Sequence, residues 1–330
     1  MGKRTKQRLK YTGVKIIQMI AVLALLSIAV FTIARLCPGD PLRAYYGDGA
    51  EHMSQEQREA ARERLGLNDS MLVQYQRWTE GLFDGDLGLS YKYKQPVSTI
   101  IGRVWINTLA LGALSYVLTF SLAILLGMFC ALREDKLIDR LICKVGVISG
   151  SIPSFFLALL LILVFAVQLG IFPAGGAYSY GNSENILDRL WHLALPVTVL
   201  VLEHLWYYAY MVRNKLVEET RQDYVLLCKA EGIPRRKILC RHCLRNIMPS
   251  MLVVMAIAVP HILGGTYVVE SVFSYPGLGT LSFESAMYQD YNMLMALCML
   301  TGAAVVICNL VAQLIGEFID PRMQREEAEI

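Results

Sequence analysis

Residues 16–33 read IIQMIAVLALLSIAVFTI, and this stretch decides the class of fold. The run holds no charged side chain, and a cluster of Lys and Arg residues precedes it. A helix needs about 20 mostly apolar residues to cross the hydrocarbon core of a bilayer, so the run predicts a membrane-spanning helix. A cleavable signal peptide is the alternative, but it requires a shorter apolar core and a small-residue cleavage site. Residues 34–37 are a poor site of that kind, which favours an uncleaved first span.

Composition extends this interpretation to the whole chain. Of the 330 residues, 55% are apolar and 18% are charged, and the mean hydropathy is positive. Soluble domains carry about a quarter charged residues. Five further apolar runs lie at about residues 107–132, 141–170, 190–211, 249–269 and 293–315. The sequence therefore predicts an all-α membrane protein with six transmembrane helices, and the Gly and Pro within these runs are tolerated when neighbouring helices satisfy the freed backbone groups.

The distribution of positive charge predicts the orientation. Most of the 31 Lys and Arg residues fall in residues 1–15, 133–144, 213–245 and 322–325. By the positive-inside rule these connections are cytoplasmic, so we expect a multi-pass protein of the cell membrane with both termini in the cytoplasm. The division that follows is a cytoplasmic N-terminus and first span (1–36), an external segment (37–103), a five-span core (104–322) and a cytoplasmic tail (323–330).

The external segment is too polar to span the membrane. Ser54 and Gln57 have the spacing of a capping box that opens a short helix, and Gly66 is placed to end it. Residues 70–83 are predicted to form a second helix, with Leu72, Tyr75, Trp78 and Leu82 on one face. A small helical cap on the outer face of the membrane is expected.

The most informative polar stretch is DYVLLCKAEG, residues 223–232, in the largest cytoplasmic connection. It predicts a short helix from about Asp223 to Glu231, ended by Gly232 in the left-handed conformation and by Pro234 just beyond. Ala230 would allow another surface to approach closely. A basic cluster follows and is suited to lipid headgroups: Arg235, Arg236, Lys237, Arg241 and Arg245. An ordinary basic loop is the alternative.

The same stretch resembles the coupling motif of the permease subunits of ABC importers. The shared positions are Ala230, Gly232, His242, Leu244, Asn246 and Pro249. Several other stretches resemble the peptide/nickel (dipeptide–oligopeptide) branch of that family: residues 38–41, 65–67, 74–75, 85–88 with Ser90, 107–109, 153–155, 195–196, 267–270, 273–279, 290–291 and 320–322. Each motif is weak by itself, but the ordered set covers nearly the whole chain.

The resemblance implies a pathway subunit and not an enzyme. It implies a second permease chain, two cytoplasmic ATPase subunits that grip a coupling helix at 223–232, and an extracytoplasmic solute-binding protein. The residues that it assigns to coupling are Asp223, Tyr224, Ala230, Glu231 and Gly232. The chain has no phosphate-binding loop, so ATP and magnesium are expected on the partner subunits. No cofactor of its own and no nucleic-acid partner are expected.

Three ionisable residues within the spans depart from the family pattern. Glu203 and His204 lie in the fourth span and His261 in the fifth, and Gln313 stands where an Asp is expected in the sixth. An ionisable group in a span costs about 2.5–3.5 kcal/mol on insertion scales and usually faces a cavity or a partner. These three are therefore candidates for the substrate pathway, with interhelical hydrogen bonding as the alternative.

An external loop is the second candidate site. Glu270 lies at the outer end of the fifth span, and Pro276, Gly277 and Gly279 form a turn signal after it. The loop could gate the outer mouth or touch a delivery protein, and a purely structural turn is equally compatible with the residues.

The eight cysteines give no disulfide framework. Cys240 and Cys243 have the spacing of half a zinc site, but no second pair accompanies them at zinc-site spacing, so incidental thiols are favoured and no metal site is expected. The cargo is expected to be peptides, with nickel or a metal chelate as the alternative. A stand-alone secondary transporter and a membrane-embedded enzyme are rival functions, but neither an internal repeat nor a catalytic cluster supports them.

Overall fold

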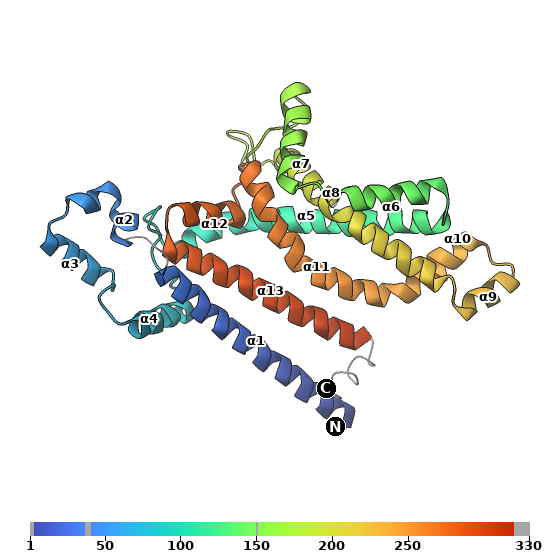
Figure 1. Ribbon diagram of the computed structural model, residues 1–330, viewed down its shortest axis with the longest axis horizontal. Coiled ribbons are helices and arrows are strands. Elements are labelled where there is room, and N and C mark those ends of the chain that lie inside the picture. The colour runs from blue at the N-terminus through green and yellow to red at the C-terminus, as the bar shows by residue number, and fades with distance from the viewer. Residues whose placement is uncertain (1–2, 37–40, 150, 320–330) are drawn as a thin grey trace. The chain divides into compact units, whose positions relative to one another are not determined.

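The computed structural model describes residues 3–36, 41–149 and 151–319, and the fold there is almost entirely helical (Figure 1). Within these ranges there is no strand, and one isolated β-bridge joins Leu89 and Pro96. The chain forms two compact units. Residues 1–106 and 276–307 make the first, and residues 107–275 and 308–330 make the second.

The first unit holds the N-terminal helix and the polar segment after it. Its elements are α1 (Lys3–Leu36), α2 (Pro41–Tyr46), the 3₁₀ helix η1 (Gly47–His52), α3 (Gln55–Arg64), α4 (Met71–Asp84), the start of α5 (Val97–Leu132), α12 (Leu278–Met287) and most of α13 (Tyr291–Ile319). α1 and α13 run side by side (Figure 1), and a side chain at Gly302 of α13 would collide with Leu26 of α1. The glycine therefore allows this close approach.

The second unit holds the helices of the predicted core. These are the rest of α5, then α6 (Leu137–Ser149), α7 (Ser154–Leu161), the π-helix η2 (Ile162–Gln168), α8 (Ile186–Glu219), α9 (Asp223–Ala230), α10 (Arg235–Lys237), the π-helix η3 (Ile238–Cys243) and α11 (Leu244–Val272). α8 packs against α6, α7 and α11. Val199 and Leu200 of α8 and Ile262 of α11 are among the most buried side chains of this unit and belong to one apolar core.

Four helices of the described residues are long and apolar enough to cross a membrane. They comprise Thr12–Leu36, Val97–Leu132, Arg235–Val272 and Tyr291–Ile315, and they contain the predicted first, second, fifth and sixth spans. The predicted fourth span lies inside α8, which has 34 residues but is not among the four. α8 also carries polar groups along its length, including His192, Glu203 and His204. The fold is thus that of a multi-pass helical membrane protein.

The predicted third span is not one continuous helix, and this is a correction. α6 ends at Ser149, α7 begins at Ser154, and Gly150 lies outside the described residues. Pro153 is the N-cap of α7 with an extended backbone (φ −60°, ψ 137°). The proline has no N–H, and its ring disfavours helix at the residue before it. The chain therefore makes two short helices where the hydropathy pattern suggested one.

The helices of the external segment form as their end signals predict. Ser54 and Gln57 make the reciprocal capping box of α3, and Gly66 follows this helix with a φ of +66°. Ser70 caps α4, whose Tyr75 and Trp78 pack on Phe31 of α1 with ring centroids 5.3 and 5.8 Å away. Two residues of the predicted apolar face, Tyr75 and Trp78, thus pack against α1 within the first unit, whereas Leu72 is exposed.

Candidate functional site

The short helix α9 and its C-terminal turn are the first candidate site. Gly232 has a φ of +74°. Its N–H donates to the carbonyl of Lys229, and the N–H of Ile233 donates to the carbonyl of Cys228, both at 3.0 Å. This pair of bonds is a Schellman motif, which satisfies carbonyls that the helix end would otherwise leave unpaired. The structure thus places Gly232 in the conformation that the sequence predicted, and α9 itself ends at Ala230.

The inner face of α9 is tied to the two long helices that flank it. The Tyr224 hydroxyl donates to Oε1 of Glu219 at 2.9 Å, and the Asn246 amide donates to the same oxygen at 3.1 Å. Glu219 is the last residue of α8, and Asn246 lies in the first turn of α11. Val225, also on α9, is 1% exposed and belongs to a buried apolar cluster with Leu216 of α8 and Ile247 of α11. Burial, with Cys243 and Glu219 as neighbours, raises the pKa of Tyr224, so its phenol remains a neutral donor.

The outer face of α9 carries apolar side chains that the sequence analysis did not single out. Leu226 and Leu227 are each 62% exposed, and Asp223, Ala230 and Glu231 are exposed as well. Tyr224, by contrast, faces inward. The signal for the leucines was available, because two adjacent leucines beside a buried valine on a short helix cannot all point to the interior.

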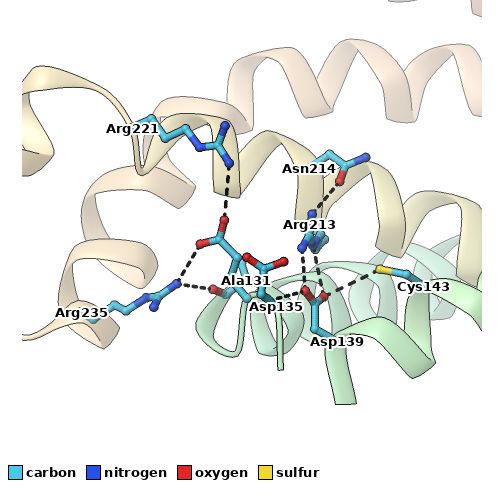
Figure 2. Close-up of polar contacts among 9 residues, drawn as sticks. Ala131, Asp135, Asp139, Cys143, Arg213, Asn214, Arg221 and Arg235 are labelled. Atoms are coloured by element: carbon cyan, nitrogen blue, oxygen red, sulfur yellow. Dashed lines mark hydrogen bonds and ion pairs between the residues drawn. The ribbon is translucent and has the colours of Figure 1, made fainter. Parts of the chain in front are cut away.

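A second set of contacts joins both flanks of α9 to the turn between α5 and α6 (Figure 2). Arg235, just after α9, donates to the carbonyl of Ala131 at 3.0 Å and to Glu134 at 3.2 Å. Arg221, just before α9, lies 3.7 Å from the other carboxylate oxygen of Glu134. Ala131 is in the last turn of α5, so Arg235 occupies one of the carbonyls at that helix end.

A buried ion pair lies beside this turn and joins α6 to α8 (Figure 2). Arg213 binds Asp139 through two bonds, of 3.1 Å from Nε and 2.6 Å from Nη2, and the Asp135 N–H adds a third at 3.0 Å. The Asp139 side chain is 2% exposed. Burial acts to raise the pKa of Asp139, but the Arg213 guanidinium and the Asp135 N–H outweigh it and hold that pKa below its ordinary value.

The three ionisable residues of the predicted pathway come together in one cavity. Glu203, His204 and His261 line a hollow of about 500 Å³ between α8 and α11, within the second unit. Tyr207 and Tyr208 also line it, and the remaining wall is methionine and aliphatic. The sequence placed these groups in two spans but could not show that they face the same space. Their role in a pathway stays a prediction.

The predicted external loop differs in structure from the expectation. Glu270 is part of α11 and fully buried, and the Thr108 hydroxyl donates to its carboxylate at 2.7 Å. Pro276 and Gly277 precede α12, but Gly279 lies in the first turn of that helix. Glu270 thus lies near the end of α11, as predicted, whereas the turn predicted over residues 276–279 covers only Pro276 and Gly277, because α12 begins at Leu278. Gly277 has an extended backbone (φ −134°, ψ −177°), which any residue can adopt.

No group of three His, Cys, Asp or Glu side chains with the arrangement of metal ligands occurs in the residues that the structure describes. Cys240 is exposed and its sulfur lies 3.2 Å from that of Met128, whereas Cys243 is buried beside Tyr224. The two thiols thus have different surroundings.

Comparison with known families now defines the class of protein. The family model of the binding-protein-dependent transport system inner membrane component matches residues 123–325, and the model of the N-terminal part of such components matches residues 9–112. The chain belongs to this family of ABC importer permeases.

Individual relatives are similar over nearly the full chain. The oligopeptide transport system permease protein AppB of Bacillus subtilis is 35% identical over 92% of this chain and 96% of its own length. The metal-staphylopine import system permease protein CntB of Staphylococcus aureus is 29% identical over 96% of this chain and 98% of its own. The chain is therefore a permease subunit of a binding-protein-dependent ABC importer, and the rival of a stand-alone secondary transporter is not supported.

A solved structure shares the fold. A chain of the inward-facing MetNI methionine ABC transporter superposes with a TM-score of 0.53, at 18% identity, over 67% of this chain and 96% of that chain. At this identity the likeness concerns the fold alone.

Proposed function

We propose that this chain forms half of a translocation pathway and pairs with a second permease chain of similar fold. Two cytoplasmic ATPase subunits, which bind ATP and magnesium, hold the α9 helix of each permease. An extracytoplasmic solute-binding protein delivers the cargo. The chain crosses the cell membrane six times with both termini in the cytoplasm, and residues 141–170, which include most of α6 and all of α7 and η2, make the third, interrupted crossing.

The single observation that supports this proposal is the construction of α9. The helix shows two leucines on its outer face, and its inner face is bonded to Glu219 at the end of α8 and through it to Asn246 at the start of α11. An exposed apolar patch on a short helix suits a protein partner. A displacement of α9 would therefore be transmitted directly to α8 and α11.

The same two helices carry the proposed pathway residues. Glu203 precedes Glu219 by about 24 Å along α8, from the rise of 1.5 Å per residue. His261 lies further along α11 from Asn246. Closing of the ATPases would thus displace α9, and α8 and α11 would carry that displacement to the walls of the cavity. This is rocking of packed helices, which changes access from one side to the other.

Peptides are the proposed cargo, in line with the oligopeptide permease of Bacillus subtilis. A metal chelate is the second candidate, because the metal-staphylopine permease is also similar over most of the chain and because His204 and His261 line the cavity. Neutral imidazole is a common ligand of nickel and zinc.

The ATPase contact can be tested by co-purification. Leu227→Asp should reduce recovery of the ATPase with the tagged permease by about tenfold or more, because a charge replaces an apolar contact in the interface. Leu72→Asp is the matched control, since Leu72 is 67% exposed but lies on α4 in the predicted external segment. Equal recovery of the ATPase with both variants would contradict the assignment of α9.

A further inference from the structure

The cavity between α8 and α11 is rich in acceptors and lacks cationic side chains. Oε2 of Glu203 is buried and has no hydrogen-bond partner among the described residues. Neither Lys nor Arg lines the cavity. A buried carboxylate oxygen without a donor is costly, by about 1–3 kcal/mol or more. The site therefore favours an occupant that supplies donors and positive charge.

His204 adds a second acceptor because its tautomer is fixed. Its Nδ1 lies 3.0 Å from the carbonyl oxygen of Leu200. A carbonyl can only accept, so Nδ1 carries the proton, and in the neutral ring Nε2 is then an acceptor. The histidine that lines the cavity thus offers a lone pair beside the carboxylate of its neighbour Glu203.

Two tyrosine rings complete the wall. Tyr207 and Tyr208 both line the cavity, and their ring centroids are 5.2 Å apart. Tyr207 is 60% exposed, so its ring is not covered by the rest of the chain. Aromatic faces attract cations through the ring quadrupole. A carboxylate, an acceptor imidazole and aromatic rings are together the groups that bind an organic ammonium ion.

We propose that this cavity binds the protonated amino group of the solute as it passes along the pathway. The proposal rests on the proposed function and specifies its substrate class: a solute that carries a primary ammonium group next to apolar surface. The ammonium pairs with the carboxylate of Glu203 and donates to Nε2 of His204, and the exposed ring of Tyr207 attracts its charge. A free carboxylate group would be repelled by Glu203.

The test measures binding without transport. The purified complex of both permeases and the ATPases is placed in lipid nanodiscs, without ATP and without the solute-binding protein. The probes are phenethylammonium, which is charged, and its N-acetyl derivative, which is neutral and otherwise similar in shape. Saturation-transfer NMR reports binding of each. The charged probe should bind and the neutral probe should not.

Three variants locate the binding. Glu203→Gln keeps the shape but removes the charge, and should weaken binding of phenethylammonium by about tenfold, the loss expected for one hydrogen bond to a charged group. Tyr207→Ala should weaken it and Tyr207→Phe should not. Glu218→Gln is the control, because Glu218 is an exposed acid on the same helix that pairs with Lys215.

The results that would contradict the proposal can be distinguished from one another. Equal binding of both probes, or unchanged binding to Glu203→Gln, would overturn the proposal. Displacement of the charged probe by stoichiometric Ni²⁺ would assign the cavity to a metal instead. Loss of the second permease from the Glu203→Gln complex would show that Glu203 pairs across the interface between permeases. Because no step requires uptake, failure of the parent complex to import peptides would contradict the proposed function alone.

Discussion

At the scale of the residue, Gly232 is the position where a single substitution is expected to affect transport most. Nothing lies within 4 Å of the position that a Cβ would take, so a Cβ there meets no atom of a neighbouring element. Its cost is conformational, because a β-branched residue in the left-handed region loses about 1–2 kcal/mol. Gly232→Val should therefore reshape the end of α9 and leave the helix bundle intact. Uptake should fall about tenfold, and substrate-stimulated ATP hydrolysis should be lost.

Gly181 provides a matched control for that substitution. It also has a left-handed backbone, with a φ of +81°, and nothing lies within 4 Å of the position that its Cβ would take. It lies between η2 and α8, far along the chain from α9. Gly181→Val carries the same conformational cost but should leave uptake within twofold of the parent. The measurements are membrane content by immunoblot, uptake in proteoliposomes and ATP hydrolysis. Normal uptake by Gly232→Val would remove the coupling role.

Asp139 allows a prediction of stability. Asp139→Asn leaves Arg213, whose side chain is 18% exposed, without its anionic partner. The expected loss is about 2–3 kcal/mol, the scale of hydrogen bonds to charged groups, seen as a lower midpoint of thermal unfolding in detergent. Glu218→Gln, in an exposed pair, should change stability by about 0.5 kcal/mol or less. Similar midpoints for the two variants would contradict a stabilising role of the buried pair.

The Asp139–Arg213 pair also predicts how the stability of the fold depends on pH. The pKa of Asp139 in the folded chain lies below its ordinary value, so its contribution is complete at neutral pH and is lost as the pH falls through the folded-state pKa. The parent should therefore lose more stability on acidification than Asp139→Asn does. Unfolding midpoints measured at several pH values between neutral and acid would show whether the two curves converge.

At the scale of the element, Glu134 links α9 to the end of α5. It faces Arg221 before α9 and Arg235 after it. Glu134→Arg would repel both, so the α5–α6 turn should no longer follow α9. Both arginines are more than half exposed, and ion pairs at the surface contribute little stability. We therefore expect normal assembly and basal ATP hydrolysis, with fewer solutes imported per ATP hydrolysed. Glu134→Arg combined with Arg235→Glu should partly restore the number of solutes imported per ATP. Lys136→Glu, a charge reversal in the same turn, should not lower that number.

Features of the elements that depend on neighbouring residues could be predicted from the sequence, whereas contacts between distant residues could not. The capping box at Ser54 and the end of α9 at Gly232 depend on residues a few positions apart, and these predictions are confirmed. The face predicted for α4 is confirmed at Tyr75 and Trp78 but not at Leu72, which is exposed. The interruption at Pro153 was missed because a proline within an apolar run was expected to be tolerated in one helix, whereas Pro153 begins a new helix. The contacts of Glu134 were missed because their partners lie 87 and 101 positions away, and no local pattern predicts such a pairing. The cavity could not be predicted for the same reason, because Glu203 and His261 face one space only after α8 and α11 have packed.

At the scale of the whole molecule, the orientation in the membrane remains a prediction from charge. The positive-inside rule assigns the basic connections to the cytoplasm, and this assignment places α9 where soluble ATPases can reach it. Single cysteines in a cysteine-free background test it, with an impermeant thiol reagent applied to intact cells. Positions 51 and 289 should react from outside, and positions 136 and 236 should react only after the membrane is opened. All four parent residues, Glu51, Gln289, Lys136 and Arg236, are exposed, so a lack of reaction reports sidedness and not burial. The reversed pattern would put α9 outside the cell, where no ATP-driven subunit could act on it, and both the topology and the coupling role would then be wrong.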